Sequence, residues 1–286
     1  MTRARVCLTG LRFRIVLALL LAAAGVLFAA QARHRWRQTL SPFWVRTIYD
    51  IPYGPQPENR LDILQRRWST GATDRPAVIV FHGGGWREGS RQEMLVRVCH
   101  RYLEQGFVIA NVDYRTGTIS AAVEDAVSAL AWYFRHVSEY GASRTKIVVT
   151  GESAGSHLAL MAAFRSKEPV AAVVNIYGVT DLMGMMDRPA VLTVLPRDNP
   201  EPVAKALSPV THVRPGLPPV FSVHGTADEV VPSAQTALLT RAIREAGGEA
   251  YELYVEGGQH GFSEGQQEAA YVAIFEFLKR RGVLDQ

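Results

Sequence analysis

The chain has 286 residues, of which 48% are hydrophobic and 20% are charged, and its mean hydropathy is close to zero. This composition is typical of a globular protein with a full core and excludes a disordered or collagen-like chain. The two cysteines, Cys7 and Cys99, exclude a disulfide framework. An α/β protein of this length commonly forms one domain.

The net charge of +4 and the isoelectric point of about 9.2 come from one end of the chain. Residues 1–37 contain seven of the 31 basic residues, whereas the first acidic residue is Asp50. Residues 38–286 therefore hold 24 basic and 27 acidic residues, a net charge of −3. This part has no cluster of lysine and arginine that would follow a phosphate backbone, so we expect no nucleic-acid partner.

The N-terminal part, residues 1–37, has the pattern of a targeting segment. Residues 15–30 are sixteen consecutive residues without a charge, and four arginines precede them. As a helix, residues 15–32 would span about 27 Å, just short of the hydrocarbon core of a bilayer. A signal peptide, cleaved after the A-x-A triplet at 30–32, and a signal anchor that holds the protein to a membrane both stay open. A buried core helix is a third, weaker interpretation.

The distribution of arginines around this segment indicates its orientation. Four arginines and the amino terminus precede it, and three arginines follow it. The positive-inside rule then favours an N-terminus in the cytoplasm and places residues 38–286 outside, in the periplasm or the medium. The alternative is attachment to the inner membrane with residues 38–286 in the cytoplasm.

Eight short runs rich in β-branched residues predict strands, and five longer amphipathic stretches predict helices. The predicted strands are 45–49, 60–64, 77–81, 108–113, 146–150, 171–176, 219–223 and 251–256. The predicted helices are 91–104, 120–138, 154–164, 234–246 and 264–280.

The alternation of these strands and helices predicts an α/β fold with a mostly parallel sheet of about eight strands, covered by helices on both faces. A turn-rich stretch, residues 52–57, joins the first two strands and indicates an antiparallel edge. Residues 178–218 interrupt the alternation. We interpret them either as a lid or pocket wall or as a surface excursion with a short helix.

A serine stands between two glycines in the sequence GESAG at residues 151–155. The motif follows a predicted strand and opens a predicted helix, which is the context that a nucleophile elbow requires. Without this context the motif is short enough to arise by chance. Ser153 is therefore the candidate nucleophile.

A second glycine motif, HGGGW at residues 82–86, follows the predicted strand 77–81. Three glycines allow the backbone to pass close to a substrate and to aim N–H groups at it. The N–H groups of Gly83, Gly84 and Ala154 are the candidate oxyanion hole. A phosphate-binding loop is disfavoured, because the motif lacks both the GxGxxG spacing and the lysine of a P-loop.

A serine nucleophile needs a base and an acid that orients the base. His260 lies in the glycine-rich sequence GGQHGF after the last predicted strand and is the candidate base. Asp228, just after the strand 219–223, is the candidate acid, with Glu229 and Asp181 as weaker alternatives. The chain order serine, aspartate, histidine is that of an α/β-hydrolase.

The chain resembles the α/β-hydrolase superfamily, and within it the HGGG-motif esterase and lipase group related to hormone-sensitive lipase and to bacterial feruloyl or acetyl esterases. The resemblance covers residues 49–284. It implies the same roles for Ser153, Asp228 and His260, with Ser156 at a position where relatives often have glycine. The motifs that carry it are HGGGW at 82–86, DYR at 113–115, GESAGSHLA at 151–159, HGTADEVVP at 224–232 and GGQHGF at 257–262.

These residues predict a serine carboxylic-ester hydrolase that acts on a small-molecule ester, of a short-chain or acetyl type, through an acyl-enzyme. This chemistry needs no metal and no cofactor. Residues 113–128 also resemble isoprenylcysteine methylesterases and arylformamidases, so a methylesterase and an amidase remain alternatives. A peptidase and a non-catalytic hydrolase fold are weaker ones.

Four hydrophobic residues flank the predicted catalytic loops and are candidate pocket walls, with core packing as the alternative for each. They are Trp86, Met183, Met186 and Phe262.

Overall fold

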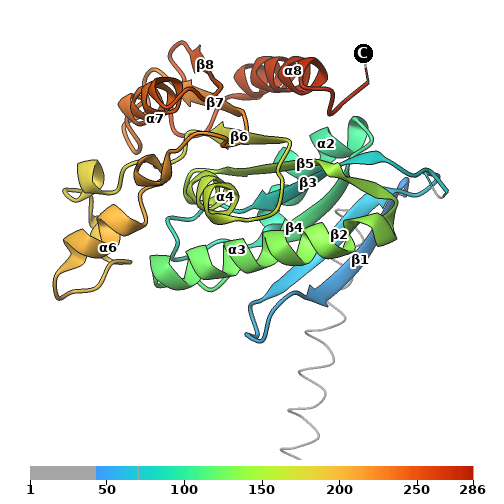
Figure 1. The fold of residues 1–286 in the computed structure, drawn as a ribbon, viewed down its shortest axis with the longest axis horizontal. Coiled ribbons are helices and arrows are strands. Elements are labelled where there is room, and N and C mark those ends of the chain that lie inside the picture. The colour runs from blue at the N-terminus through green and yellow to red at the C-terminus, as the bar shows by residue number, and fades with distance from the viewer. Residues whose placement is uncertain (1–42, 70, 286) are drawn as a thin grey trace, which may run out of the picture. The chain divides into compact units, whose positions relative to one another are not determined.

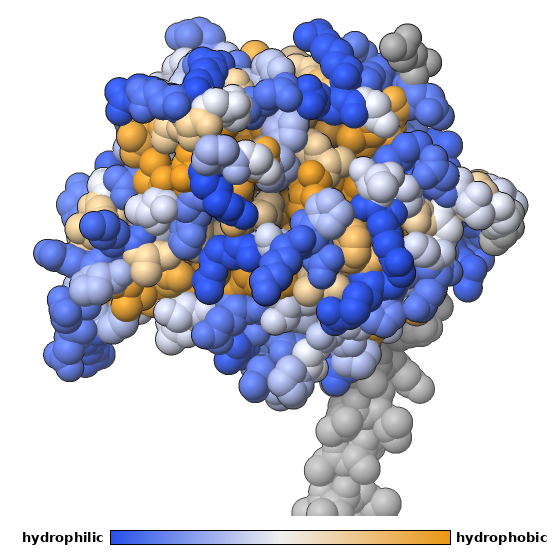
Figure 2. All heavy atoms as spheres, in the orientation of Figure 1, coloured by the Kyte–Doolittle hydropathy of each residue, from blue (hydrophilic) through white to orange (hydrophobic). Residues whose placement is uncertain are grey.

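The computed structural model describes residues 43–69 and 71–285. The targeting segment 1–37, including the predicted membrane segment 15–32, lies outside the described residues. Within the described part, no helix is long and apolar enough to cross a bilayer. Polar residues cover most of the face seen in Figure 2, with hydrophobic side chains visible between them.

The core of the fold is one eight-stranded sheet in the order β1-β2-β4-β3-β5-β6-β7-β8 (Figure 1). The six strands β4, β3, β5, β6, β7 and β8 run parallel to one another, whereas β2 is antiparallel to both of its neighbours, β1 and β4. The prediction of a mostly parallel sheet with an antiparallel edge is confirmed. The strands are Val45–Pro52 (β1), Arg60–Arg66 (β2), Arg75–Phe81 (β3), Val108–Val112 (β4), Ala142–Glu152 (β5), Ala172–Ile176 (β6), Val220–Gly225 (β7) and Ala250–Val255 (β8).

Helices connect the parallel strands, as the βα alternation predicts. A capping box at the start of α8 shows how the sequence sets a boundary: Gln266 N–H donates to Ser263 Oγ, and the Gln266 side chain accepts from Ser263 N–H. The helices are His100–Glu104 (α2), Ile119–His136 (α3), Ala154–Arg165 (α4), Pro189–Leu192 (α5), Pro200–Ala206 (α6), Ala234–Glu245 (α7) and Glu264–Arg280 (α8).

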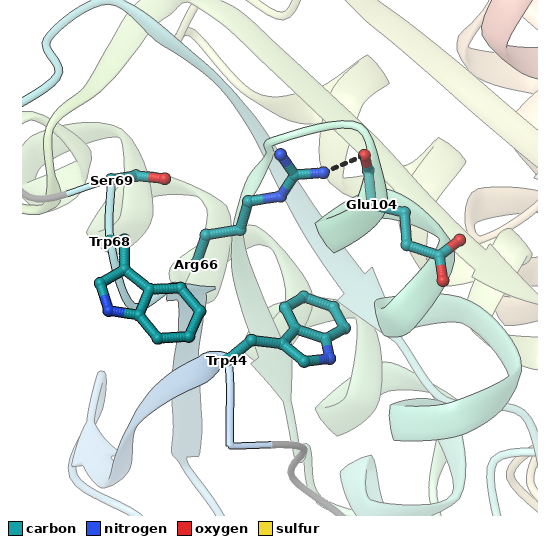
Figure 3. A pocket seen from close by; sticks show the side chains of 5 residues that line it. All are labelled: Trp44, Arg66, Trp68, Ser69 and Glu104. Carbon is teal, nitrogen blue, oxygen red and sulfur yellow. Dashed lines mark hydrogen bonds between the residues drawn. The ribbon is translucent and has the colours of Figure 1, made fainter.

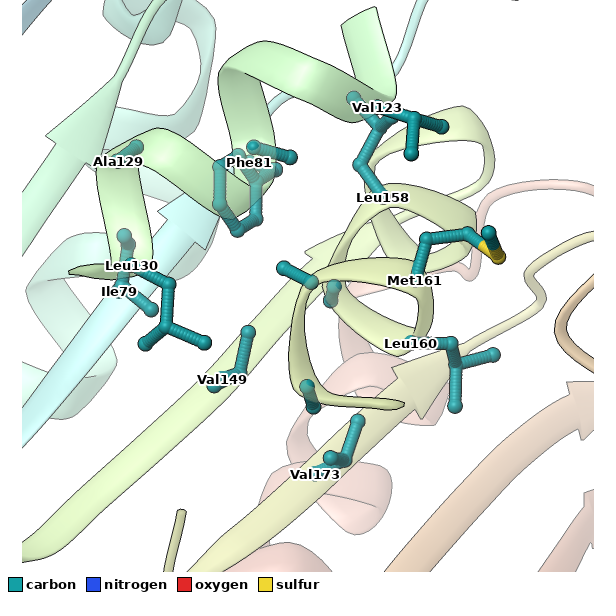
Figure 4. Close-up of a cluster of buried hydrophobic side chains, with 14 of the residues drawn as sticks. Ile79, Phe81, Val123, Ala129, Leu130, Val149, Leu158, Leu160, Met161 and Val173 are labelled. Carbon is teal, nitrogen blue, oxygen red and sulfur yellow. The ribbon is translucent and has the colours of Figure 1, made fainter. Parts of the chain in front are cut away.

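Both faces of the sheet are buried, because successive side chains of a strand point to opposite faces. Ile79 and Phe81 of β3 and Val149 of β5 belong to one hydrophobic cluster with residues of α3 and α4 (Figure 4). Their neighbours Val78 and Val148 are equally buried but lie outside that cluster. The central strands are therefore apolar throughout rather than alternating, as expected for a parallel sheet.

On the other face of the sheet, helices α2 and α8 contact each other. The ring of Tyr102 in α2 makes edge-to-face contacts with Tyr271 and Phe275 of α8, with centroids 6.0 and 5.4 Å apart. Arg101 and Glu268 form an ion pair between the same two helices. Residues about 170 positions apart are thus packed together on this face.

The predicted helix 91–104 is irregular. A 3₁₀ turn at Arg91–Glu93 is followed by a π-helical turn at Leu95–Cys99 and only then by α2. The first turn is tied down at Arg91, whose carbonyl oxygen accepts hydrogen bonds both from the Asn111 side chain and from Met94 N–H. Its guanidinium is buried among Asp50, Asp62 and Asp113, so the first turn is tied to the sheet.

The segment 178–218 folds into 3₁₀ turns and the short helices α5 and α6 rather than into one extended loop. Leu182, Met185 and Val191 are buried in the main hydrophobic cluster, and Val194 C=O accepts from Ile119 N–H at the start of α3. This segment is therefore packed against the body of the domain.

The close approach of α4 to β3 yields a testable prediction. A methyl group on Gly155 would overlap the carbonyl oxygens of Phe81 and His82, which are backbone atoms that cannot rotate away. We expect Gly155→Ala to lower the free energy of unfolding by about 1–3 kcal/mol or more, as overpacked cores do. Urea unfolding followed by circular dichroism measures this change.

Gly265→Ala is the matched control, because Gly265 lies in α8 with no atom within 4 Å of the added methyl group. That variant should be unchanged or more stable by roughly 0.5 kcal/mol, since alanine favours the helix. Equal effects of the two substitutions would contradict the packing argument.

Candidate active site

Five loops meet where the parallel strands end. The HGGGW loop follows β3, Ser153 follows β5, Tyr177 follows β6, Asp228 follows β7 and His260 follows β8. The carboxyl ends of parallel strands lie along one edge of the sheet, which is where open α/β sheets bind ligands. Residues far apart in the chain are thereby brought to one place.

Ser153 occupies a sharp turn between β5 and α4. Its backbone angles, φ 54° and ψ −119°, are unfavourable for a residue with a side chain. The turn is held from behind by Ser156, whose Oγ lies 2.6 Å from Gly151 O and accepts from Ile176 N–H at 2.8 Å. Serine at position 156 therefore ties the turn to β6, through hydrogen bonds that glycine could not make.

Ser153, His260 and Asp228 form one hydrogen-bonded chain. His260 Nδ1 lies 2.8 Å from Asp228 Oδ2, and His260 Nε2 lies 2.8 Å from Ser153 Oγ. A carboxylate only accepts hydrogen bonds, so Nδ1 carries the proton and Nε2 is free to accept the serine O–H. This arrangement can remove the hydroxyl proton as the serine attacks an electrophile.

Asp228 is held rigidly in its ionised form. Its Oδ1 accepts from the N–H groups of Val230 and Val231 at 3.0 and 2.9 Å, and its side chain is fully buried. Burial raises the pKa of Asp228, but the hydrogen bonds from His224 and His260 outweigh it and hold the pKa well below its usual range. A carboxylate in this state can orient His260 and stabilise its protonated form.

His224 is a site residue that the sequence analysis missed. It is fully buried, and its Nε2 lies 2.8 Å from Val231 O and 3.4 Å from Asp228 Oδ2. Because Nε2 faces two oxygen acceptors it carries the proton, and Nδ1 accepts from the Thr236 hydroxyl at 2.8 Å. The four-residue spacing to Asp228 in HGTAD was the available signal.

The predicted oxyanion-hole residues lie beside the serine. Gly83 and Gly84 line the same cavity as Ser153, and Ala154 is the first residue of α4, where N–H groups have no acceptor within the helix. Gly84 has φ +107°, and a side chain there would overlap Glu88 O, so only glycine fits this turn.

The cavity at Ser153 has a volume of about 370 Å³ and carries many charges. Among the described residues, its apolar wall consists of Met94, Ala190 and Val230. The remaining lining residues are Gly83, Gly84, Gly85, Arg87, Glu88, Glu93, Arg97, Glu152, Ser153, Tyr177, His260 and Gly261.

The four predicted pocket walls, Trp86, Met183, Met186 and Phe262, are not among the residues that line the cavity at Ser153. Trp86 has φ +58°, and its indole is buried, with 2% exposure, and donates to His157 Nδ1 at 3.2 Å. Met183 faces solvent and Met186 packs on the core. Phe262 packs edge-to-face on the ring of Tyr177.

A charged pair next to the nucleophile is the main feature of the cavity that the sequence did not reveal. Glu152 is buried, and its carboxylate is 2.5 Å from the guanidinium of Arg97, which comes from the π-helical turn. Arg97 also lies 3.4 Å from the Tyr177 hydroxyl, and the Tyr177 ring packs against His260. No local pattern links Arg97 to Glu152, because 55 residues separate them.

The described residues contain no candidate metal site. No group of three or more histidine, cysteine, aspartate or glutamate side chains there could hold a metal ion.

An eight-stranded, mostly parallel sheet with a serine at a strained turn between β5 and α4 defines an α/β-hydrolase. A family model described as BD-FAE matches residues 61–243. The chain therefore belongs to the BD-FAE family of esterase-type α/β-hydrolases.

Its relatives are named as esterases. Esterase LipQ of Mycobacterium tuberculosis is 34% identical over 223 residues, covering 69% of this chain and 53% of LipQ. A probable isoprenylcysteine alpha-carbonyl methylesterase of Oryza sativa, ICME, is 29% identical over 247 residues, covering 75% of this chain and 58% of the relative. The chain thus spans somewhat more than half the length of these curated relatives.

A solved esterase has the same fold over nearly its whole length. The esterase Est2 of the Planctomycetes species Thermogutta terrifontis, in its propionate-bound structure, superposes with a TM-score of 0.71 at 28% identity. The match covers 85% of this chain and 97% of that one.

The buried Glu152 predicts a particular dependence of stability on pH. Burial raises the pKa of Glu152 above its ordinary value of 4.5, and Arg97 offsets only part of the rise. The Glu152 carboxyl therefore loses its proton at a lower pH in the unfolded chain than in the folded protein. As a result, the free energy of unfolding of the wild type falls as the pH rises through the pKa of Glu152 in the folded protein. Glu152→Gln removes this dependence.

We therefore expect the free energy of unfolding of Glu152→Gln, relative to wild type, to increase as the pH rises above 4.5. Urea unfolding at a series of pH values measures the difference. Glu201→Gln, an exposed position in α6, controls for the substitution itself. A difference that stays constant with pH would show that the buried carboxyl does not titrate in this way.

Proposed function

We propose that this protein hydrolyses carboxylic esters by a Ser-His-Asp mechanism, with Ser153 as nucleophile, His260 as base and Asp228 as orienting acid. The observation that carries this proposal is the hydrogen-bonded chain of these three side chains, which ends at a cavity of about 370 Å³. The esterase names of the relatives and of the solved neighbour support the same reaction.

In the first step, Ser153 Oγ attacks the ester carbonyl while His260 Nε2 takes the hydroxyl proton. The negative charge that forms on the carbonyl oxygen is received by the N–H groups of Gly83, Gly84 and Ala154. Loss of one such donor typically costs about 3–4 kcal/mol of transition-state stabilisation. The proton on His260 then passes to the leaving alcohol, and the acyl group remains on Ser153.

In the second step, water attacks the acyl-enzyme while His260 takes a proton from that water. The bond between the acyl carbon and Ser153 Oγ then breaks, His260 returns the proton to Oγ, and the carboxylic acid leaves. Asp228 keeps the proton of the neutral imidazole on Nδ1 throughout, which leaves Nε2 facing the reacting oxygen. Since His224, Val230 and Val231 hold the carboxylate in place, the imidazole keeps its direction between the two steps.

Removing the nucleophile tests this mechanism. Ser153→Ala should lower kcat for p-nitrophenyl acetate by roughly 10⁴-fold or more, because no hydroxyl remains to form the acyl-enzyme. Ser128→Ala, at an exposed position of α3, is the matched control and should retain activity. Turnover by a folded Ser153→Ala variant at the wild-type rate would refute the proposed mechanism.

The cavity favours an ester of a short acyl chain. Its aliphatic side chains are Met94, Ala190 and Val230, and five charged side chains also line it, those of Arg87, Glu88, Glu93, Arg97 and Glu152. A long hydrocarbon chain would displace the water around these charged groups, which is unfavourable. That the similar esterase Est2 is described with propionate bound supports a short acyl group.

A second candidate is a methylesterase acting on a prenylated cysteine ester, which the similarity to ICME favours. The two candidates differ in the apolar surface they require. We expect p-nitrophenyl acetate and propionate to have kcat/KM values at least roughly tenfold above the p-nitrophenyl octanoate ester. With methanol as the common leaving group, methyl propionate should likewise exceed N-acetyl-S-farnesylcysteine methyl ester. Preference for the farnesylated ester would instead establish the methylesterase.

A further inference from the structure

A second, larger cavity lies outside the candidate active site. It has a volume of about 580 Å³ and is lined by Trp44, Arg66, Trp68, Ser69 and Glu104 (Figure 3). Two indole rings are the main apolar surface of this cavity, and the side chain of Trp68 is 69% exposed. An exposed apolar patch rimmed by polar residues is typical of a surface that contacts another protein or a membrane.

This cavity lies at the amino ends of the parallel strands, whereas Ser153 lies at their carboxyl ends. Trp44 precedes β1, and Val45 pairs with Arg66 at the end of β2. Since β2 is antiparallel to β4, the end of β2 lies beside the start of β4, and Arg66 Nε donates to Leu103 O there. The loops at Ser153 and His260 follow the other ends of the parallel strands. A five-residue strand such as β4 separates the two edges by about 17 Å.

The exposed side chains around this cavity combine indole rings and arginines with one acidic residue, Glu104. The Arg66 guanidinium also donates to the backbone carbonyl oxygens of Leu103 and Glu104. Arg46, Arg66 and Arg67 are exposed next to the two tryptophans. We call Trp44, Arg46, Arg66, Arg67 and Trp68 the tryptophan face. Tryptophan is enriched where a membrane meets water, because its ring is apolar and its N–H is polar. Arginine adds attraction to anionic headgroups while its methylene groups rest on apolar surface.

The chain itself connects the tryptophan face to the predicted membrane segment. Eleven residues, 33–43, separate position 32 from Trp44, and fully extended they would reach at most about 38 Å. A bilayer that holds residues 15–32 would therefore stay within this distance of Trp44. Because the chain tethers the tryptophan face to the bilayer, the effective concentration of one at the other is high. A weak contact is then sufficient to hold the tryptophan face on the bilayer.

We propose that the tryptophan face rests on the surface of the lipid bilayer that holds residues 15–32. The catalytic edge of the sheet then points away from the lipid into water. The orientation does not depend on which reaction Ser153 performs. Its consequence, that the ester reaches Ser153 from the aqueous phase and not from the bilayer, rests on the function proposed above.

Quenching of tryptophan fluorescence by brominated lipid tests this orientation. The full-length protein is reconstituted into vesicles of phosphatidylcholine and phosphatidylglycerol, with or without bromine near the headgroup end of the acyl chains. Subtracting the emission of Trp68→Phe from that of wild type isolates the signal of Trp68. We expect brominated lipid to reduce this signal by about half or more, because Trp68 lies at the interface.

A tryptophan on the catalytic side is the matched control. Leu192 is 44% exposed at the end of α5, close to Ala190 in the wall of the catalytic cavity. In the double variant Trp68→Phe/Leu192→Trp, the emission added by the new indole should be the same in both kinds of vesicle. Since this readout needs no catalysis, loss of the proposed esterase activity would leave it unchanged.

Three results would overturn the proposal. The first is that the protein stays in the supernatant when vesicles are sedimented. The second is that bromine quenches the indole at position 192 and leaves the Trp68 signal unchanged. The third is that soluble xylohexaose changes the Trp68 signal while brominated lipid does not, since the two tryptophans would then be a saccharide-binding platform.

Discussion

The turn at Ser153 is the constraint on which the rest of the structure depends. To expose the serine above the sheet, the chain must leave β5 and enter α4 within one residue, at a φ of 54°. Such a turn brings α4 so close to β3 that only glycine fits at position 155, against the carbonyl oxygens of Phe81 and His82. Hydrogen bonds from Ser156 to β5 and β6 oppose the strain of this turn.

The remaining groups of the site are arranged around that fixed serine. Each comes from a loop at the carboxyl end of a different strand, so the sheet determines their spacing. The imidazole of His260 is oriented by Asp228, and Asp228 is held in turn by two backbone N–H groups and by His224. Polar groups buried in this way are rigid because every donor and acceptor has a partner.

The two ends of the parallel strands, which we call the carboxyl edge and the amino edge of the sheet, differ in chemistry as well as in position. The carboxyl edge carries a cavity with charged walls, in which Arg97 pairs with the buried Glu152 next to the serine. The amino edge carries exposed tryptophan and arginine side chains close to the point where the N-terminal segment joins the domain. In the orientation we propose, one edge binds lipid while the other receives the substrate.

The sequence by itself determined the elements and singled out the three side chains that the structure joins in one hydrogen-bonded chain. Buried apolar runs predicted all eight strands to within a few residues, and short motifs identified Ser153, Asp228 and His260, because these features depend on local chain geometry. The cavity walls were decided only by the tertiary structure. The Trp86 ring is buried against His157, 71 residues away, and Arg97 of the π-helical turn contacts Glu152 across 55 residues. Such contacts depend on how whole elements pack, which no local pattern in the sequence records.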